Sequence, residues 1–183
     1  MRVHPFFQSL LLFLGLGLLA GGCATADQDR GSDEALSLYE VHHDGRIHVF
    51  YDKGLYEDFL KLGETPFRLT RIGAGPHGET VVFGLTKQDK KMKKPVPAIA
   101  IFDGKRDAPT RFYGEMVREG RIYVFDNYAQ MKAVRELGEP TYRFTRIGAG
   151  PRGETVVFVL TKANKKQRPD ALIARFEAEH AGS

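Results

Sequence analysis

The chain has 183 residues, a formal net charge of +4 at pH 7 and a single cysteine, Cys23. A lone cysteine excludes an internal disulfide, so the folded body depends on its hydrophobic core alone. Once the N-terminal segments are set aside, about 145 residues remain, a length that suits one domain or two very small ones.

The beginning of the chain predicts export. A basic start is followed by an apolar run over residues 10–20, which contains Gly15 and Gly17. This run is too short and too rich in glycine for a membrane span, and it is typical of a signal peptide. The small residues 20–22 then lead directly to Cys23.

This ending resembles the lipobox of bacterial lipoproteins, although leucine is more usual where Ala20 stands. The resemblance implies that the Cys23 thiol is diacylated, that the signal is cleaved before it and that the new amino terminus is acylated. Ala24, where an aspartate would favour the inner membrane, implies the outer membrane, and we expect its periplasmic side. Acyl chains contribute about 0.8 kcal/mol per buried methylene, so such an anchor is almost permanent. A plain secretory signal with an incidental cysteine is the alternative.

The polar, acidic segment after Cys23 predicts a flexible tether, and no other segment is long and apolar enough to span a membrane. The rest of the chain is an internal duplication. Residues 44–87 align without gaps to residues 119–162, and 25 of the 44 positions are identical. We therefore divide the chain into a signal peptide (1–22), a lipidated cysteine and tether (23–36), repeat 1 (37–102), a linker (103–111), repeat 2 (112–178) and a tail (179–183).

In repeat 1, two strands flank the turn at Asp44-Gly45, and a helix capped by Asp52 follows them. That helix is expected to bury Leu55, Phe59 and Leu62 and to end at Gly63.

Repeat 2 gives the same pattern with other residues. The turn is Glu119-Gly120 and the helix cap is Asp126. The expected apolar stripe is Met131, Val134 and Leu137, and the expected helix end is Gly138.

A strand, a glycine loop and a further strand come next in each repeat, and a fifth strand is expected at 97–102 and 170–176. The predicted fold class is α+β, with two tandem β-β-α-β-β-β repeats that form antiparallel sheets. One repeat alone is marginal in size, so we expect the two to pack through their apolar faces about a pseudo-twofold axis. Two separate bodies are the alternative.

The glycine loops GAGPHG (73–78) and GAGPRG (148–153) match the dinucleotide fingerprint G-x-G-x-x-G. That fingerprint needs a helix directly after the loop, because the helix amino terminus holds the pyrophosphate. The following residues, Glu-Thr-Val-Val-Phe, are typical of a strand instead. We therefore expect no nucleotide and interpret the motif as a hairpin loop whose glycines supply positive φ angles.

Arginine and glutamate flank each loop. If position 71 pairs with 79, Arg71 faces Glu79 and Arg146 faces Glu154, closing the end of the core. The alternative is that exposed loop amides beside an arginine bind an anionic group. The candidate ligand-binding residues are then Arg71, Gly73, Gly75, Gly78, Arg146, Gly148, Gly150 and Gly153.

The sequence gives little support for a metal site or for a catalytic site. The histidines of repeat 1 correspond in repeat 2 to residues that are not metal ligands: His42, His43, His48 and His77 align with Val117, Arg118, Tyr123 and Arg152. No nucleophile motif is present. We expect no metal, no cofactor and no enzyme activity.

GRIHVFYDKGLYEDFL (45–60) resembles the core of small YHS-type metal-associated modules, but the cysteine ligands common in those modules are absent after Cys23. The lysine runs 87–94 and 162–168 lack interleaved aromatic residues, so we interpret them as solvated loops and expect no nucleic acid.

The sequence thus favours an outer-membrane lipoprotein with a binding or scaffolding role, whose partner is an envelope protein or glycan. One alternative is an accessory protein that binds an anionic envelope ligand through the paired glycine loops. A hydrolase or metal-dependent enzyme is a further alternative.

Overall fold

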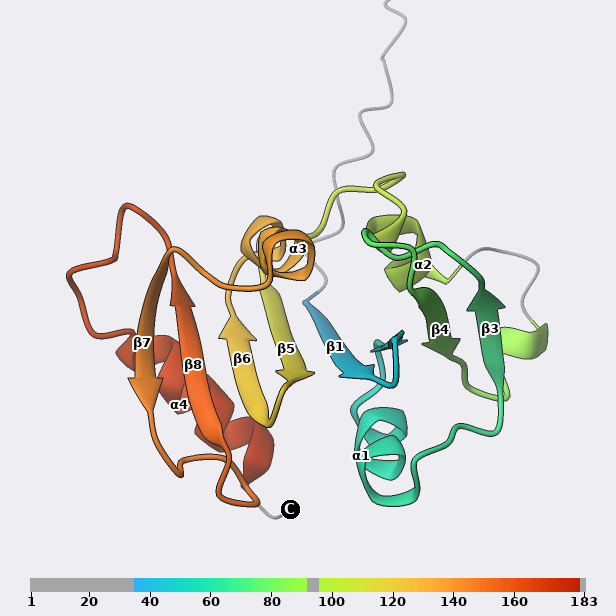
Figure 1. Cartoon of the computed structure of the whole chain (residues 1–183), viewed down its shortest axis with the longest axis horizontal. Helices are drawn as coiled ribbons and strands as arrows, with labels where there is room; N and C mark the ends of the chain where they lie inside the picture. Colours follow the sequence, from blue (N-terminus) through green and yellow to red (C-terminus); the bar gives the residue numbers. More distant parts are fainter. Residues whose placement is uncertain (1–34, 92–95, 182–183) are drawn as a thin grey trace, which may run out of the picture. The chain divides into compact units, whose positions relative to one another are not determined.

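The structure is a computed structural model that describes residues 35–91 and 96–181, all of which belong to one compact unit, Gly31–Ser183. Its elements follow each other along the chain as shown in Figure 1. They are β1 (Leu36–His43), β2 (Arg46–Phe50), α1 (Lys53–Leu62), β3 (Arg68–Arg71), β4 (Thr80–Gly84), the 3-10 turn η1 (Asp89–Lys91), α2 (Pro97–Phe102), β5 (Phe112–Arg118), β6 (Arg121–Phe125), α3 (Tyr128–Leu137), β7 (Tyr142–Arg146), β8 (Thr155–Leu160) and α4 (Asp170–His180).

The fold is α+β and is built on one mixed sheet with the strand order β3-β4-β2-β1-β5-β6-β8-β7. We call β1 to α2 the first half and β5 to α4 the second half. The halves join edge to edge, because β1 and β5 pair in parallel from Leu36↔Phe112 to Val41↔Val117. The expected antiparallel sheets packed face to face are therefore wrong: β2/β4 and β6/β8 are also parallel pairs.

The two-residue turns are confirmed. Asp44 and Gly45 have φ angles of 49° and 67°, and Glu119 and Gly120 have 52° and 72°. Two successive positive φ angles are the mark of the turn that matches the twist of antiparallel strands. These turns therefore fix the register of β1 with β2 and of β5 with β6.

Local capping explains where the two long helices begin and end. The Asp52 side chain accepts a hydrogen bond from the Leu55 amide at 2.9 Å, as expected. In α3 the cap is Asn127 and not Asp126. The asparagine aligns with Asp52 at the repeat offset, and it satisfies the amide three residues later. Gly63 and Gly138 end the helices with positive φ angles, as expected.

The buried faces of these helices differ from the expected stripes. In α1 the buried residues are Tyr56 and Phe59, whereas Leu62 is 73% exposed. In α3, Arg135 joins Met131 and Val134 on the buried face, and Leu137 is 78% exposed. In both helices the buried arc begins at Tyr56 or at the equivalent Met131 and reaches the terminal glycine two turns later, so the leucine before that glycine faces solvent.

The expected fifth strands are wrong, since both segments are helices. In α2, Pro97 stands at the first turn, where its fixed φ angle favours a helix start. In α4, Leu172, Ile173 and Phe176 are buried, which is helical and not strand spacing. A short apolar run does not distinguish a strand from a buried helix by periodicity alone.

The outer hairpins have a register different from the one expected. Arg71 pairs with Val81 and Leu69 with Phe83, two residues from the predicted partners. The second half repeats this pairing, with Arg146 opposite Val156. The shift keeps each side chain on its predicted face and lengthens the loop to residues 72–79.

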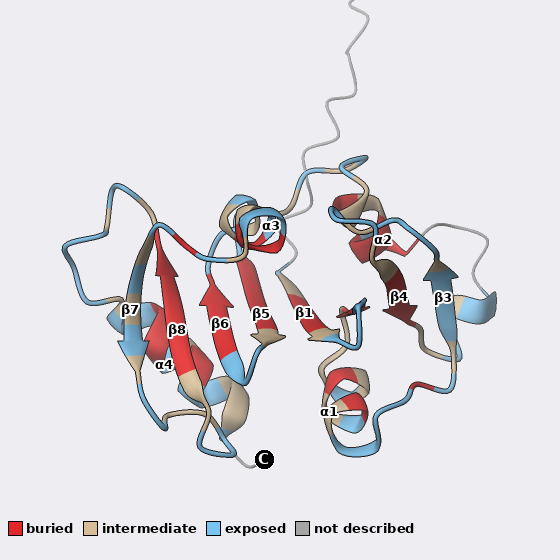
Figure 2. Cartoon of the chain, viewed as in Figure 1, coloured by how far each residue is buried: buried red, intermediate tan, exposed pale blue. Residues whose placement is uncertain are grey.

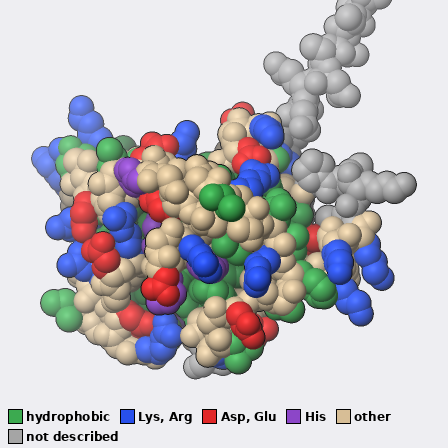
Figure 3. Space-filling model, turned by 45° about the vertical axis from the view of Figure 1, so that its right-hand side comes forward, with side chains coloured by type: hydrophobic (Ala, Val, Ile, Leu, Met, Phe, Trp, Pro, Cys, Tyr) green, Lys and Arg blue, Asp and Glu red, His purple; other side chains and the backbone are tan. Residues whose placement is uncertain are grey.

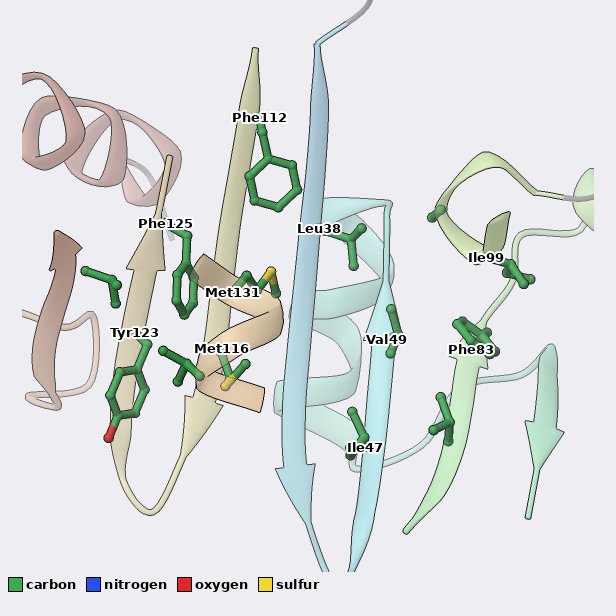
Figure 4. Close-up of a cluster of buried hydrophobic side chains, with 14 of the residues drawn as sticks. Leu38, Ile47, Val49, Phe83, Ile99, Phe112, Met116, Tyr123, Phe125 and Met131 are labelled. Atoms are coloured by element: carbon green, nitrogen blue, oxygen red, sulfur yellow. The ribbon is translucent and has the colours of Figure 1, made fainter. Parts of the chain in front are cut away.

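The core lies on both faces of the sheet, where the central strands are buried and β3 and β7 are more exposed (Figure 2). One cluster joins side chains of both halves with Met131 and Val134 of α3 and Ile99 of α2 (Figure 4). The other cluster joins the opposite side chains with Tyr56 and Phe59 of α1 and with α4. Each face is thus covered by one helix from each half.

Two buried carboxylates lie in the central strands. Glu40 is fully buried, and its two oxygens accept hydrogen bonds from Arg135 Nε at 3.0 and 3.1 Å. Burial raises the pKa of Glu40, but the charge of Arg135 and a hydrogen bond with His42 outweigh it and lower the pKa below its ordinary value. Glu115, at the equivalent place in β5, accepts hydrogen bonds from Tyr113 and Tyr56.

Replacing Arg135 tests how much the buried Glu40–Arg135 ion pair stabilises the fold. We expect Arg135→Met to lower the free energy of unfolding by about 3–5 kcal/mol, because Glu40 is left buried and unpaired. Chemical denaturation measures the loss. The matched control is Arg143→Met, which breaks an exposed pair with Glu139 and should cost less than about 1 kcal/mol. Equal losses in both variants would contradict the assignment.

Candidate functional site

The glycine loops at residues 73–78 and 148–153 form the candidate site that the sequence predicts. Gly73 and Gly78 have φ angles of 69° and 85°, and Gly148 and Gly153 have 68° and 84°. The expectation that these glycines supply positive φ angles is confirmed.

Gly75 and Gly150 serve a different purpose, since their φ angles are not positive. A Cβ atom on Gly75 would lie 2.9 Å from the Cβ of Glu79, so the missing side chain makes room for that glutamate. The Glu79 carboxylate accepts a hydrogen bond from the His77 amide at 2.8 Å, and Glu154 accepts one from the Arg152 amide at 2.8 Å. In each loop, a backbone amide therefore binds the carboxylate of the glutamate at the end of the same loop.

These hydrogen bonds also affect the loop glutamates. Partial burial raises the pKa of Glu79 and Glu154, but hydrogen bonds from backbone amides more than offset burial and lower the pKa of both. Both side chains are therefore carboxylates at neutral pH.

The expected pairs of Arg71 with Glu79 and of Arg146 with Glu154 are wrong. Arg71 Nη1 lies 2.5 Å from an oxygen of Asp103, just after α2, and Arg146 Nη1 lies 2.6 Å from Glu177 of α4. The shifted register moves each arginine away from the loop glutamate and toward the last helix of its half. The arginines thus tie the outer hairpins to α2 and α4. Ligand binding by the loop residues stays a prediction.

The sheet carries two further concave sites, one in each half. The first is a cavity of about 490 Å³ on the open face of β2, β3 and β4, beside the end of α1. It is lined by Arg46, His48, Phe59, Gly63, Glu64, Thr65, Arg68, Thr70, Ile72, Thr80 and Val82. The second, of about 280 Å³, is lined by Arg121, Glu139, Arg143, Thr145, Ile147, Thr155 and Val157.

The two cavities are equivalent. Each residue that lines the second has the same residue type 75 positions earlier in the lining of the first. The aligned segments as a whole are identical at only 25 of 44 positions. Sequence reasoning missed this site, although identical residues at alternate positions of the strands were a signal for a shared face.

The cavities lie on opposite faces of the sheet. Val157, in the second cavity, belongs to the buried cluster that contains α3. In β4 the members of that cluster are Val81 and Phe83, so Val82 in the first cavity faces the other side.

The second cavity is bordered by a carboxylate that pairs with its arginines. Glu139 accepts hydrogen bonds from Arg121 at 3.3 Å, from Arg143 at 3.1 Å and from the Tyr123 hydroxyl at 3.2 Å. Every charged group that lines this cavity is therefore paired.

The first cavity has arginines at the equivalent positions, but they are not paired with a carboxylate. Within residues 35–91 and 96–181, Arg46, Arg68 and Glu64 form no ion pair. His48 stands where the second half has Tyr123. Among the buried side-chain nitrogen and oxygen atoms of the described chain, only His48 Nδ1 has no hydrogen-bond partner. An unsatisfied buried polar atom is uncommon and calls for an explanation.

Burial and charge both act on His48. The side chain is only 7% exposed and packs on Phe59, with ring centroids 4.3 Å apart. Burial, together with the nearby charges of Arg46, His43 and Arg68, lowers the pKa of His48 to about 4. The ring is therefore neutral at pH 7.

The other candidates are dispersed. Among the described residues, no group of three or more histidine, cysteine, aspartate or glutamate side chains could hold a metal ion. His42 bonds Glu40, and His43 pairs with Asp44 at the turn. Basic and acidic side chains lie interspersed on the face shown in Figure 3, with apolar side chains exposed between them.

The predicted signal and lipidation site, Cys23, lies outside the described residues. Within the described part, none of the helices has the length and apolar character needed to cross a membrane. No protein-family model, curated protein or solved structure matches the chain.

The lowered pKa of His48 predicts a pH dependence of stability. Between pH 6.5 and about 4 the unfolded chain binds a proton that the folded cavity rejects, so stability is lost as the pH falls through this window. We expect His48→Tyr, which introduces the residue of the second half, to flatten the profile in this range. Thermal unfolding at a series of pH values measures it. Parallel profiles for the two proteins would show that His48 does not titrate in this way.

Proposed function

We propose that this protein is a lipid-anchored binding module of the bacterial outer membrane, held on the periplasmic side through Cys23. The support for the anchor is the lipobox-like ending of the N-terminal apolar run at the only cysteine of the chain. The body has no need of that thiol, because it buries an extensive core on both faces of its sheet.

We also infer that the two halves arose by duplication and are related by an approximate twofold axis that lies in the plane of the sheet, along the strands. The strand order is mirrored about the parallel β1/β5 pair, which favours this axis. An in-plane twofold exchanges the faces of the sheet, which accounts for α1 and α3 packing in different clusters. It also accounts for cavities on opposite faces.

The binding role is supported mainly by the lining of the two cavities. Every residue that lines the second cavity is of the same type as its counterpart in the lining of the first. Exposed side chains such as Arg46, Arg68 and Thr70 are not needed for packing. Their retention in both copies, while the helices between them changed, favours a use at the surface.

The glycine loops are the second candidate for binding an anionic envelope ligand. They too are nearly identical in both halves, and Ile72 and Ile147 within them are each 90% exposed. Their amides at His77 and Arg152, however, already bind the loop's own glutamates. The cavities therefore support a binding role better than the loop amides do.

Changing Cys23 tests the anchor. We expect the wild-type chain, expressed in a Gram-negative host, to incorporate labelled palmitate and to fractionate with the outer membrane. Cys23→Ala should lose the label and move to the soluble fraction, because the acyl chains supply the membrane affinity. Ala24→Asp is the matched control, since it keeps the lipid and should shift the protein to the inner membrane. A Cys23→Ala chain that stays fully membrane-bound would refute the proposal.

A further inference from the structure

The cavity in the first half differs from its counterpart in one chemical respect, namely that its cationic groups lack an anion. In the second half, Glu139 bridges Arg121 and Arg143. In the first half, the equivalent Glu64 borders the cavity but pairs with neither Arg46 nor Arg68 within the described residues. The chain differs just after this glutamate, with Thr65-Pro66 in place of Pro140-Thr141.

We propose that the first cavity binds a ligand through a carboxylate group, held between Arg46 and Arg68 in the position that Glu139 occupies in the second half. This inference rests on the proposed binding function and names its site and ligand class. The second half serves as the template: one carboxylate there accepts a hydrogen bond from each arginine, at 3.3 and 3.1 Å, through different oxygens. Guanidinium groups favour this recognition of a planar anion.

His48 is a second chemical difference between the two cavities. In the template, Tyr123 at the same position donates its hydroxyl hydrogen to the carboxylate at 3.2 Å. His48 is buried in the lining of the first cavity, and its Nδ1 has no partner in the described chain. That atom has almost no accessible surface, so a ligand in the cavity would meet the exposed part of the ring and the arginines, without the internal hydroxyl donor that Tyr123 supplies in the template.

The remaining lining suggests the rest of the ligand. Thr70 and Thr80 offer hydroxyl groups, whereas Phe59, Val82 and the exposed Ile72 offer apolar contacts. The site therefore fits an organic carboxylate with an apolar group beside the acid, such as the end of a short peptide. The volume of about 490 Å³, larger than the 280 Å³ of the second cavity, leaves room for it.

Binding is tested on the full chain in detergent, with N-acetyl-alanyl-alanine as the probe and its C-terminal amide as the uncharged analogue. NMR follows the His48 ring and the arginine side chains during titration. We expect saturable shifts with the acid and none with the amide. Arg46→Gln/Arg68→Gln should weaken binding about 30-fold or more, because two charge-assisted hydrogen bonds are lost.

The second half supplies the controls. Arg121→Gln/Arg143→Gln should leave binding at the first cavity unchanged, because both arginines line the cavity of the other half. Glu139→Ala should create a second site and change the stoichiometry from one to two, because it removes the side chain to which Arg121 and Arg143 are bonded. Glu64→Gln should strengthen binding several-fold, because it removes a negative charge that borders the cavity and repels the ligand carboxylate.

Three outcomes would overturn the proposal. The first is equal shifts with the acid and the amide, and the second is equal weakening by the two double-arginine variants. The third is saturation by inorganic phosphate but not by the acid, which would reassign the site to phosphate. None of these outcomes bears on the membrane anchor, because palmitate labelling and fractionation of the Cys23 variant test that separately.

Discussion

The ion pair between Glu40 and Arg135 is the constraint on which the rest of the body depends. It is buried, and it joins β1 of the first half to α3 of the second half. Arg135 also stacks on Phe102 of α2, with its guanidinium 4.3 Å from the ring centroid. Each partner would be a costly buried charge without the other, so each half is stabilised by the presence of the other. The Tyr56–Glu115 hydrogen bond ties the halves together on the opposite face.

The duplication that we infer, followed by local change, would account for two different surfaces built on one plan. The equivalent strands β2 and β6, β3 and β7, and β4 and β8 share most of their residues, as do the glycine loops, whereas β1 and β5 and the helices share few. Arg135 of α3 occupies the place of Leu60 of α1, so the buried Glu40 is paired with an arginine, whereas its equivalent, Glu115, accepts hydrogen bonds from Tyr56 and Tyr113. The same process placed His48 opposite Tyr123, and it left one cavity with a bound internal carboxylate and the other without.

Interactions within a few residues of each other could be predicted from the sequence. The turn at Asp44-Gly45, the Asp52 cap and the glycine at each helix end depend on local backbone chemistry, and all were confirmed. The partners of Arg71 and Arg146 could not be predicted, because Asp103 and Glu177 directly follow the segments 97–102 and 170–176, which were expected to be strands and are helices. Gly75 shows the same limit, since a close approach by a side chain, and not its φ angle, requires glycine there. The cavities were missed because their lining comes from three strands whose order is set by the tertiary fold.

The opposed faces of the two cavities limit how the protein can engage a partner. A flat surface laid against one face of the sheet can reach one cavity and not its equivalent, so two copies of a site on one chain do not add avidity toward a single planar target. The two cavities would instead face two different partners, one on each side of the sheet. A change that opened the second cavity would therefore convert a receptor for one ligand into a bridge between two.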